Sequence, residues 1–284
     1  MASAALTPPA LIGRSAELAA LDRHFDTALA SGAALMLTGE AGVGKSALLD
    51  AAAVRTAAAG FQVLRISGCP FQRGVGFSAL NQLLQPLAEG IPALPARQAE
   101  TLQAVRGLSE EQPTELLAIA NAVHALLART AAEDGPVALV VDDVAWVDRS
   151  SATVLGTLAR SLCVGPITVL GASRTGDESF LSSIGITEYE VQPLDDLAAN
   201  QLVSERFPAM TARVRRRLVA EARGNPWPCS NCPSPQLLAA DGAGHAARRA
   251  AVDRAAEGHL LHPGRRAPGR DPEAAAARRT RRFG

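Results

Sequence analysis

The sequence feature that most constrains the fold is Gly-Glu-Ala-Gly-Val-Gly-Lys-Ser at residues 39–46. It matches the pattern G-x-x-x-x-G-K-[ST], in which glycines let the backbone curl so that successive N–H groups point at phosphate oxygens. The short apolar run at 33–38 predicts a buried strand before it, and residues 46–59 predict a helix after it. A strand, a glycine-rich turn and a helix in this order are the context in which the pattern binds a nucleotide, and a chance match would lack them.

The lysine of this loop is the only lysine in the chain, and arginine supplies the other 27 of the 28 Lys and Arg residues. Lys45 is expected to reach the β- and γ-phosphates of ATP, and the Ser46 hydroxyl is expected to bind Mg²⁺. The positive end of the helix that begins near Lys45 would add to the attraction for phosphate. The nucleotide-binding residues expected here are Gly39, Glu40, Ala41, Gly42, Val43, Gly44, Lys45, Ser46 and Ala47.

A pair of carboxylates follows a second apolar run. Residues 136–143 predict a strand that ends in Asp142 and Asp143, and ligands of open α/β sheets bind at the carboxyl ends of strands. Asp142 is expected to hold Mg²⁺, mostly through water, and Asp143 to orient or deprotonate the attacking water. Asp148 is either a second acid behind this site or the residue that supports the start of the next helix.

One further basic residue is a candidate for catalysis. Ser173 and Arg174 end the strand predicted at 167–174, where they could contact the γ-phosphate. An arginine at this place could equally make a surface salt bridge, and the sequence favours neither interpretation. Arg174 therefore joins Lys45 and Asp143 as a catalytic candidate with two open roles.

The remaining pattern alternates strands with helices. Further strands are predicted at 61–67 and 189–192, and the first helical stretch is predicted with Ser15 as its N-cap. The alternation predicts an α/β fold of the P-loop NTPase type, a three-layer parallel sheet covered on both faces, with a small, incomplete helical lid. The predicted helical stretches are 14–30, 46–59, 77–88, 97–132, 151–162, 195–207 and 210–224.

Composition excludes several classes of protein. The formal net charge is zero, so nothing draws the whole chain to nucleic acid or to a membrane. No segment approaches the roughly 18 apolar residues of a membrane helix, and the first residues lack a signal-peptide pattern. The four cysteines are too few and too scattered for a disulfide framework. A soluble cytoplasmic protein is expected.

Taken together, these motifs resemble those of the ATPase module of large LuxR-family transcriptional regulators. These regulators belong to the STAND branch of the AAA-like P-loop ATPases. The likeness covers residues 11–226, and the order of its motifs is more specific than any one of them. It implies a switch in which ATP or ADP controls output, with nucleotide-dependent self-association. The segments that carry the resemblance are 11–25, 37–49, 139–155, 171–174 and 221–226.

The resemblance also implies roles for residues outside the phosphate loop. By position in that family, Gly13 and Arg14 would lie near the adenine and ribose of ATP. Gly224 and Pro226 would match the Gly-x-Pro of the helical lid, with Pro226 against the base. The large regulators continue with a sensor region and a DNA-binding helix-turn-helix. Neither is expected in this chain, so no specific DNA binding by it is expected.

The sequence departs from the family pattern directly after Pro226. Family members continue with Leu-Ala-Leu-Leu-Glu-Leu-Pro, whereas this chain continues with Trp-Pro-Cys-Ser-Asn-Cys-Pro. GC-rich codons for the latter, read from the last base of the Pro226 codon, encode the former. We therefore expect a one-base slip, with residues 227–284 out of frame. This tail carries ten Arg against five Asp and Glu, and only one Val and no Ile, so little order is expected there.

The competing interpretation of this stretch is a zinc site. Cys229 and Cys232 have Cys-x-x-Cys spacing, and three histidines of the tail could complete a set of ligands, namely His245, His259 and His262. Their separations do not fit a compact finger, so zinc is not expected. The basic tail could bind nucleic acid without sequence preference.

Four parts are expected along the chain: a leader at 1–10, an ATPase core at 11–192, a partial lid at 193–226 and the tail at 227–284. Two functions remain open. The first is an ATP-binding, slowly hydrolysing switch module of a signal-responsive transcription regulator. The second is a non-catalytic or unstable nucleotide-binding remnant, because a shortened lid could leave the nucleotide poorly enclosed. A small-molecule kinase is disfavoured, since no acceptor-binding region is recognisable.

Overall fold

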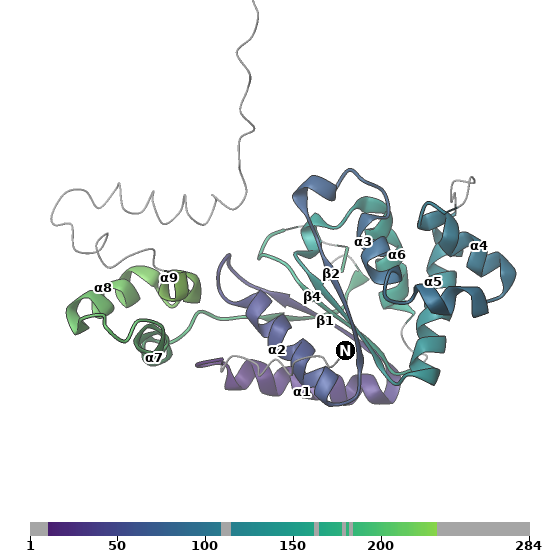
Figure 1. The fold of residues 1–284 in the computed structure, drawn as a ribbon. Coiled ribbons are helices and arrows are strands. Elements are labelled where there is room, and N and C mark those ends of the chain that lie inside the picture. Colours follow the sequence, from purple (N-terminus) through teal and green to yellow (C-terminus); the bar gives the residue numbers. More distant parts are fainter. Residues whose placement is uncertain (1–10, 109–114, 162–164, 178–179, 182–183, 232–284) are drawn as a thin grey trace, which may run out of the picture. The chain divides into compact units, whose positions relative to one another are not determined.

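The computed structural model describes residues 11–108, 115–161, 165–177, 180–181 and 184–231 (Figure 1). Five parallel strands form one sheet in the order β2-β3-β4-β1-β5. This confirms the predicted α/β fold of the P-loop NTPase type. The strands are β1 (Ala33–Thr38), β2 (Gln62–Ser67), β3 (Val137–Asp142), β4 (Ile167–Ala172) and β5 (Thr187–Glu190).

Helices follow most of the predicted stretches, and two of these stretches each divide. The stretch 77–88 becomes a short α-helix and the start of a 3₁₀ helix, and 97–132 becomes two α-helices separated by a connection. The α-helices are α1 (Ser15–Ser31), α2 (Lys45–Ala58), α3 (Ser78–Leu84), α4 (Ala96–Val105), α5 (Leu116–Glu133), α6 (Arg149–Arg160), α7 (Asp196–Arg206), α8 (Ala212–Ala222) and α9 (Pro226–Asn231). The 3₁₀ helices are η1 (Pro70–Gln72), η2 (Ala88–Ala93) and η3 (Val144–Trp146).

The predicted N-cap of the first helix is wrong by one residue. Arg14 takes the N-cap position of α1 and makes no side-chain capping bond, while Ser15 is the first helical residue. The Arg14 guanidinium instead donates to Glu17 and to the carbonyls of Val43 and Gln192, so contacts beyond the helix hold this residue in place of a capping bond.

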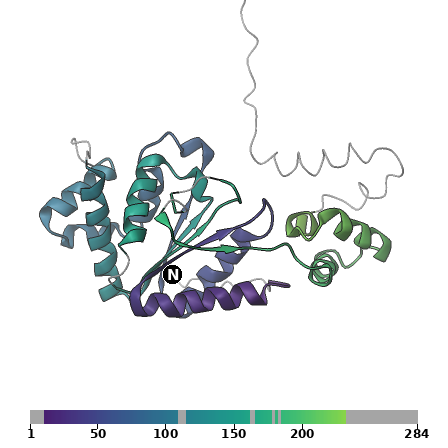
Figure 2. The same cartoon turned by 180° about the vertical axis from the view of Figure 1, so that it is seen from behind.

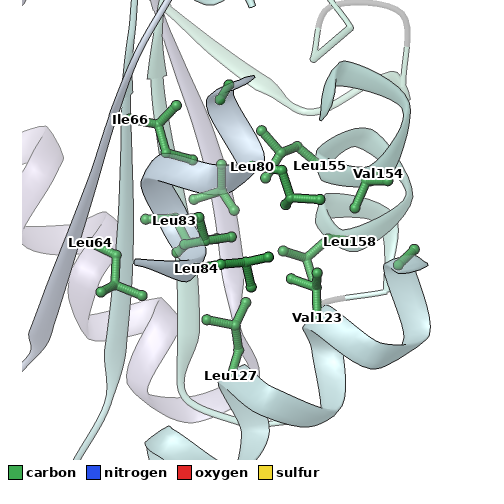
Figure 3. Packing of buried hydrophobic residues seen from close by; sticks show 14 of the residues in the cluster. Leu64, Ile66, Leu80, Leu83, Leu84, Val123, Leu127, Val154, Leu155 and Leu158 are labelled. Atoms are coloured by element: carbon green, nitrogen blue, oxygen red, sulfur yellow. The ribbon is translucent and has the colours of Figure 1, made fainter. Parts of the chain in front are cut away.

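Helices cover both faces of the sheet (Figures 1 and 2). Successive side chains of a strand point to opposite faces, so Leu35 and Leu37 of β1 pack with α1 and α2 while Met36 packs on the other face. That second face carries the larger apolar cluster, in which side chains from β2, α3, α5 and α6 meet (Figure 3). Leu80 and Leu83 of α3 are fully buried at its centre.

The order of the strands brings three loops to one edge of the sheet. Strand β4 lies between β3 and β1, and all three are parallel. Their carboxyl ends therefore deliver the glycine-rich loop, the residues after β4 and the acidic pair after β3 side by side. The sheet thus provides the shared edge at which ligands of such folds bind.

Helices α7, α8 and α9, which we call the lid, share a separate apolar cluster. Helix α9 extends five residues beyond Pro226, into the stretch for which the sequence predicts little order. Its two prolines lie in the first turn, where a missing N–H costs no helical hydrogen bond. Cys229 is completely buried in the lid cluster, at the position where the alternative reading frame would place a leucine.

The described residues bear on two further predictions, the zinc site and the membrane helix. Cys232 and the three histidines of the tail lie outside the described residues. Within the described part of the chain, no group of three or more His, Cys, Asp or Glu is placed to hold a metal ion. None of the helices described is both long and apolar enough to span a bilayer.

Candidate functional site

The glycine-rich loop joins β1 to α2, and two of its glycines have backbone conformations that other residues rarely adopt. Gly42 has φ +79° and Gly44 has φ +105°, in the left-handed region. A Cβ on Gly42 would lie 2.8 Å from the Asn225 Oδ1 atom, so the loop has no room for a side chain there. Among the described residues, the N–H groups of Ala41, Gly42 and Gly44 have no protein acceptor. The loop therefore offers several unpaired donors to an anion.

Lys45 lies within this loop with 9% of its surface exposed. Its Nζ atom donates hydrogen bonds to the carbonyls of Gly39 at 2.9 Å and Glu40 at 2.8 Å. Burial lowers the pKa of Lys45, and the nearby charge of Arg174 lowers it further, while three aspartates counteract both. An anion beside Lys45 would raise this pKa again, because an opposite charge favours the ionised form.

The acidic pair lies at the end of β3. The Asp142 Oδ1 atom accepts a hydrogen bond from the Asp143 backbone N–H at 2.9 Å, and Asp143 has φ +49°. Partial burial of the carboxyl raises the pKa of Asp143, the charge of Asp142 raises it further, and Arg174 and Lys45 act against both. A carboxylate with a raised pKa accepts a proton more readily, which is the property required of a general base.

Ser173 and Arg174 follow β4, between the loop and the acidic pair. Ser173 is 3% exposed and donates its backbone N–H to the Leu37 carbonyl at 3.0 Å. Its hydroxyl has no hydrogen-bond partner among the residues that the structure describes. Arg174 likewise forms no salt bridge within 4 Å in that part of the chain, although its charge acts on both Lys45 and Asp143. The surface salt bridge left open by the sequence is thus absent from the described structure.

Sequence reasoning missed a third aspartate at this edge. The charge of Asp177 raises the pKa of both Lys45 and Asp143. Asp177 lies in the turn after β4, where its backbone N–H donates to the Arg174 carbonyl at 3.2 Å. No motif marks this residue, because its proximity depends on the path of the turn rather than on spacing within a strand or helix.

Arg14 is buried against the back of the phosphate loop, with 4% of its surface exposed. Its guanidinium donates to Glu17 Oε1, the Gln192 carbonyl and the Val43 carbonyl, each at 2.6 Å. At the neighbouring Gly13, a Cβ would lie 2.4 Å from a lid side chain. These contacts join α1, the loop and the segment after β5. The place of Gly13 and Arg14 near adenine and ribose stays a prediction.

The start of α9 contacts the outer side of the loop. The Asn225 Nδ2 atom donates to the Ala41 carbonyl at 2.8 Å, and the Trp227 backbone N–H lies 3.2 Å from the Gly42 carbonyl. The Pro226 ring lies 3.7 Å from the position of a Cβ on Gly44. Sequence analysis gave Pro226 a role but none to Asn225 or Trp227, because their contacts join segments far apart in the sequence.

Asp148 supports helix starts rather than the acidic pair. It is the N-cap of α6, where it accepts the Ser151 N–H at 3.0 Å, and it is 1% exposed. Its carboxylate also accepts the N–H groups of Phe77 and Ala79 and the hydroxyl of Ser78, at 2.9–3.0 Å. Burial would raise the pKa of Asp148, but these hydrogen bonds outweigh it and hold the pKa below its ordinary value. Of the two roles left open, the supporting role is confirmed.

Comparison with known proteins identifies the class to which this architecture belongs. The model of the AAA ATPase domain matches residues 10–170, more than half of the chain, and the chain belongs to this family. An uncharacterized protein of Rhizobium meliloti (strain 1021) is 27% identical over 227 residues, which are 70% of this chain. The chain spans only 22% of the length of that relative.

Solved structures share the fold at low sequence identity. The ORC2 protein of Aeropyrum pernix, in ADPNP and ADP complexes, is 16% identical with a TM-score of 0.50. That match covers 88% of this chain and 69% of the other. A STAND protein with a tetratricopeptide repeat sensor from Pyrococcus horikoshii is 15% identical with a TM-score of 0.42, over 72% of this chain and 28% of the other.

Proposed function

We propose that this AAA ATPase domain binds ATP with Mg²⁺, hydrolyses ATP slowly and acts as the switch of a signal-responsive transcription regulator of the LuxR family. One observation carries the proposal: three adjacent strand ends bring Lys45, Arg174 and Asp143 together, so that the charge of Arg174 lowers the pKa of both Lys45 and Asp143. Charges of both signs around a phosphate-binding loop are the requirements of phosphoryl transfer to water.

The residues present fit ATP and Mg²⁺. Unpaired N–H groups of the loop and the buried Lys45 are donors for phosphate oxygens. Ser46 is exposed at the start of α2, and it would hold Mg²⁺ together with the Asp142 carboxylate, because Mg²⁺ prefers oxygen ligands. Bound Mg²⁺ would neutralise charge on the phosphates.

The chain's own residues divide the remaining work. Asp143 accepts the proton of the attacking water, which its raised pKa favours. Arg174 stabilises the negative charge that develops on the transferred phosphoryl group. By the family resemblance, Gly13, Arg14 and Pro226 would lie near the adenosine. These roles rest on the position of each residue in the fold and on the family resemblance.

The regulator context rests on the motif resemblance, and the length of the relative supports only a place for this domain within a longer protein. Because the chain spans 22% of that relative, an ATPase domain of this kind occurs within much longer proteins. We propose a core at 11–192 and a partial lid at 193–226, with residues 227–284 read out of frame. Sensor and DNA-binding parts, and self-association controlled by the nucleotide, would belong to the intact regulator.

A second candidate function is a remnant that binds nucleotide without turnover. The observation that favours it is the composition of α9, a six-residue helix with two prolines where the alternative frame would supply a leucine-rich helix. A weakly packed lid would exclude water poorly from the phosphates, and hydrolysis depends on that exclusion.

Calorimetric ATP binding and phosphate release by the wild type and Lys45→Ala test the proposal. We expect Lys45→Ala to weaken ATP binding about 100-fold, because it loses charge-assisted hydrogen bonds to phosphate. Arg55→Ala is the matched control, since it removes an exposed cation from the other end of α2 and should leave binding unchanged. Equal ATP affinity in Lys45→Ala would refute the site, and wild-type binding without phosphate release would favour the remnant.

A further inference from the structure

Three consecutive carbonyl groups of the phosphate loop, at residues 41–43, accept hydrogen bonds from outside the loop. The side chain of Asn225 donates to the first at 2.8 Å, and the backbone N–H of Trp227 donates to the second at 3.2 Å. The guanidinium of Arg14 donates to the third at 2.6 Å. Two of the three donors belong to the lid segment, and the third belongs to the start of α1.

These bonds act on the other side of each peptide. A peptide unit is planar, and its C=O and N–H point in opposite directions. A carbonyl held outward therefore turns the following N–H inward, which applies to the N–H groups of Gly42, Val43 and Gly44. The Val43 N–H bonds to the Glu40 carbonyl at 3.3 Å, whereas those of Gly42 and Gly44 have no acceptor among the described residues.

The loop needs such support because of its glycines. The peptides between Ala41 and Gly44 adjoin residues with φ of +79° and +105°, and glycine adopts several other conformations at little cost. Without an external donor, these peptide planes could rotate and turn their N–H groups away from the phosphates. Fixing them in advance removes an entropic cost from binding.

We propose that Asn225 is a positioning residue that orients the phosphate-binding N–H groups, so that contact between the lid and the loop sets the affinity for the nucleotide's phosphates. The inference rests on the proposed nucleotide binding and adds its regulation. Arg14 provides the permanent part of the support, since it is buried and paired with Glu17. Asn225 provides the part that depends on the lid, because the Gly224 carbonyl beside it pairs with the Leu194 N–H at the lid's entry.

Asn225 itself is held in the orientation that this role needs. Its Oδ1 atom accepts the Trp227 N–H at 3.0 Å, which leaves the amide Nδ2 directed at the Ala41 carbonyl. A carboxylate at this position would keep the first bond and lose the second. It would also face the carbonyl dipole with a negative charge until it was protonated.

The test is the dissociation constant for MgADP of the wild type, Asn225→Ala and Asn225→Asp, at pH 8 and pH 5. We expect about tenfold weaker binding for Asn225→Ala at both pH values, from loss of one hydrogen bond. Asn225→Asp should bind more weakly than Asn225→Ala at both pH values, because an aspartate with an ordinary pKa of about 3.9 stays mostly ionised at pH 5 and adds a negative charge beside the phosphate site.

Asn81→Ala is the matched control, because Asn81 makes the same type of bond, from its side-chain amide to the Val105 carbonyl, among the helices of the other layer. It should leave MgADP binding unchanged. Wild-type affinity in Asn225→Ala, with binding lost in Lys45→Ala, would overturn the role of Asn225 and leave the proposed function standing. Failure of the wild type to bind MgADP would overturn both.

Discussion

Backbone N–H groups converge at two places near the carboxyl edge of the sheet, and the two places differ in what satisfies them. At the first, the buried carboxylate of Asp148 accepts the N–H groups of Phe77, Ala79 and Ser151. At the second, the phosphate loop, the N–H groups of Gly42 and Gly44 find no acceptor within the described structure. One place has an anion of the protein's own, and the other offers equivalent donors to an anion from outside.

The comparison extends to the carboxylates of the β3 edge. Asp143 and Asp148 both follow this strand, yet their pKa values shift in opposite directions. Asp148 is surrounded by hydrogen-bond donors that stabilise its ionised form. Asp143 has Asp142 beside it and loses solvent contact without gaining a comparable set of donors. A carboxylate whose hydrogen bonds are all made stabilises the fold, whereas a carboxylate whose pKa is shifted by burial and neighbouring charges is typical of functional sites.

The largest effect is expected from Asp148→Ala, which breaks the satisfied place. Three N–H groups, of which those of Ala79 and Ser151 are buried, would lose their acceptor, so we expect the free energy of unfolding to fall by about 4 kcal/mol. Urea denaturation measures this loss. Asp148→Asn keeps one acceptor oxygen and should lose less. If the free energy of unfolding of Asp148→Ala lies within about 1 kcal/mol of the wild-type value, the carboxylate does not join α3 to α6 through these hydrogen bonds.

Asp143→Asn tests the unsatisfied place. We expect about 100-fold slower ATP turnover with ATP affinity close to that of the wild type, because the amide cannot accept the proton. Asp177→Asn is the control, since Asp177 acts on the same charges from the neighbouring turn and should alter turnover only slightly. Turnover by Asp143→Asn equal to that of the wild type would assign the base to another residue.

The pH dependence should separate the two carboxylates. Because the pKa of Asp143 is raised, acidification protonates this carboxylate at a higher pH than it would an ordinary aspartate. Below the pKa of Asp143, turnover should fall tenfold for each pH unit. The pKa of Asp148 is lowered, so its contribution to stability is present above the unfolded value of about 3.9 and lost as the pH falls through the folded value. Turnover should therefore fail at a higher pH than the Asp148 junction.

His24 adds its own pH dependence to the stability of the protein, so the effect of Asp148 is measured best in a variant that lacks this histidine. Burial lowers the pKa of His24 to about 4, and its Nε2 atom lies 2.7 Å from the Thr168 hydroxyl. Between pH 6.5 and 4 the unfolded chain therefore binds a proton more readily than the folded chain does. As the pH falls through that window, the free energy of unfolding declines by up to about 3 kcal/mol. The decline should disappear in His24→Gln. An unchanged decline in that variant would mean that another group causes it.

Much of the site could be predicted from the sequence because its signals are local. The phosphate loop and the acidic pair each adjoin an apolar run, and strand ends follow directly from such runs. That these strand ends are neighbours could not be predicted, because the pairing of β4 with both β1 and β3 depends on contacts between distant segments.

The residues that sequence reasoning missed are those whose partners lie far along the chain. Asn225 contacts a loop more than 180 residues away, and no spacing rule connects the two. The role of Asp148 was left open for the same reason, since its bonds to the start of α3 join segments about 70 residues apart. Helix α9 was missed because proline, tryptophan and cysteine carry no helical period, and its burial comes from the lid cluster.

Amide hydrogen exchange of the wild-type chain, with and without saturating MgATP, tests the difference between the two places most directly. We predict that the amides of Gly42 and Gly44 slow at least about tenfold on addition of MgATP, because phosphate oxygens become their acceptors. The amides of Phe77, Ala79 and Ser151 should be slow already and unaffected. Loop amides whose exchange is unchanged at saturation would contradict the assignment of the loop as the phosphate site.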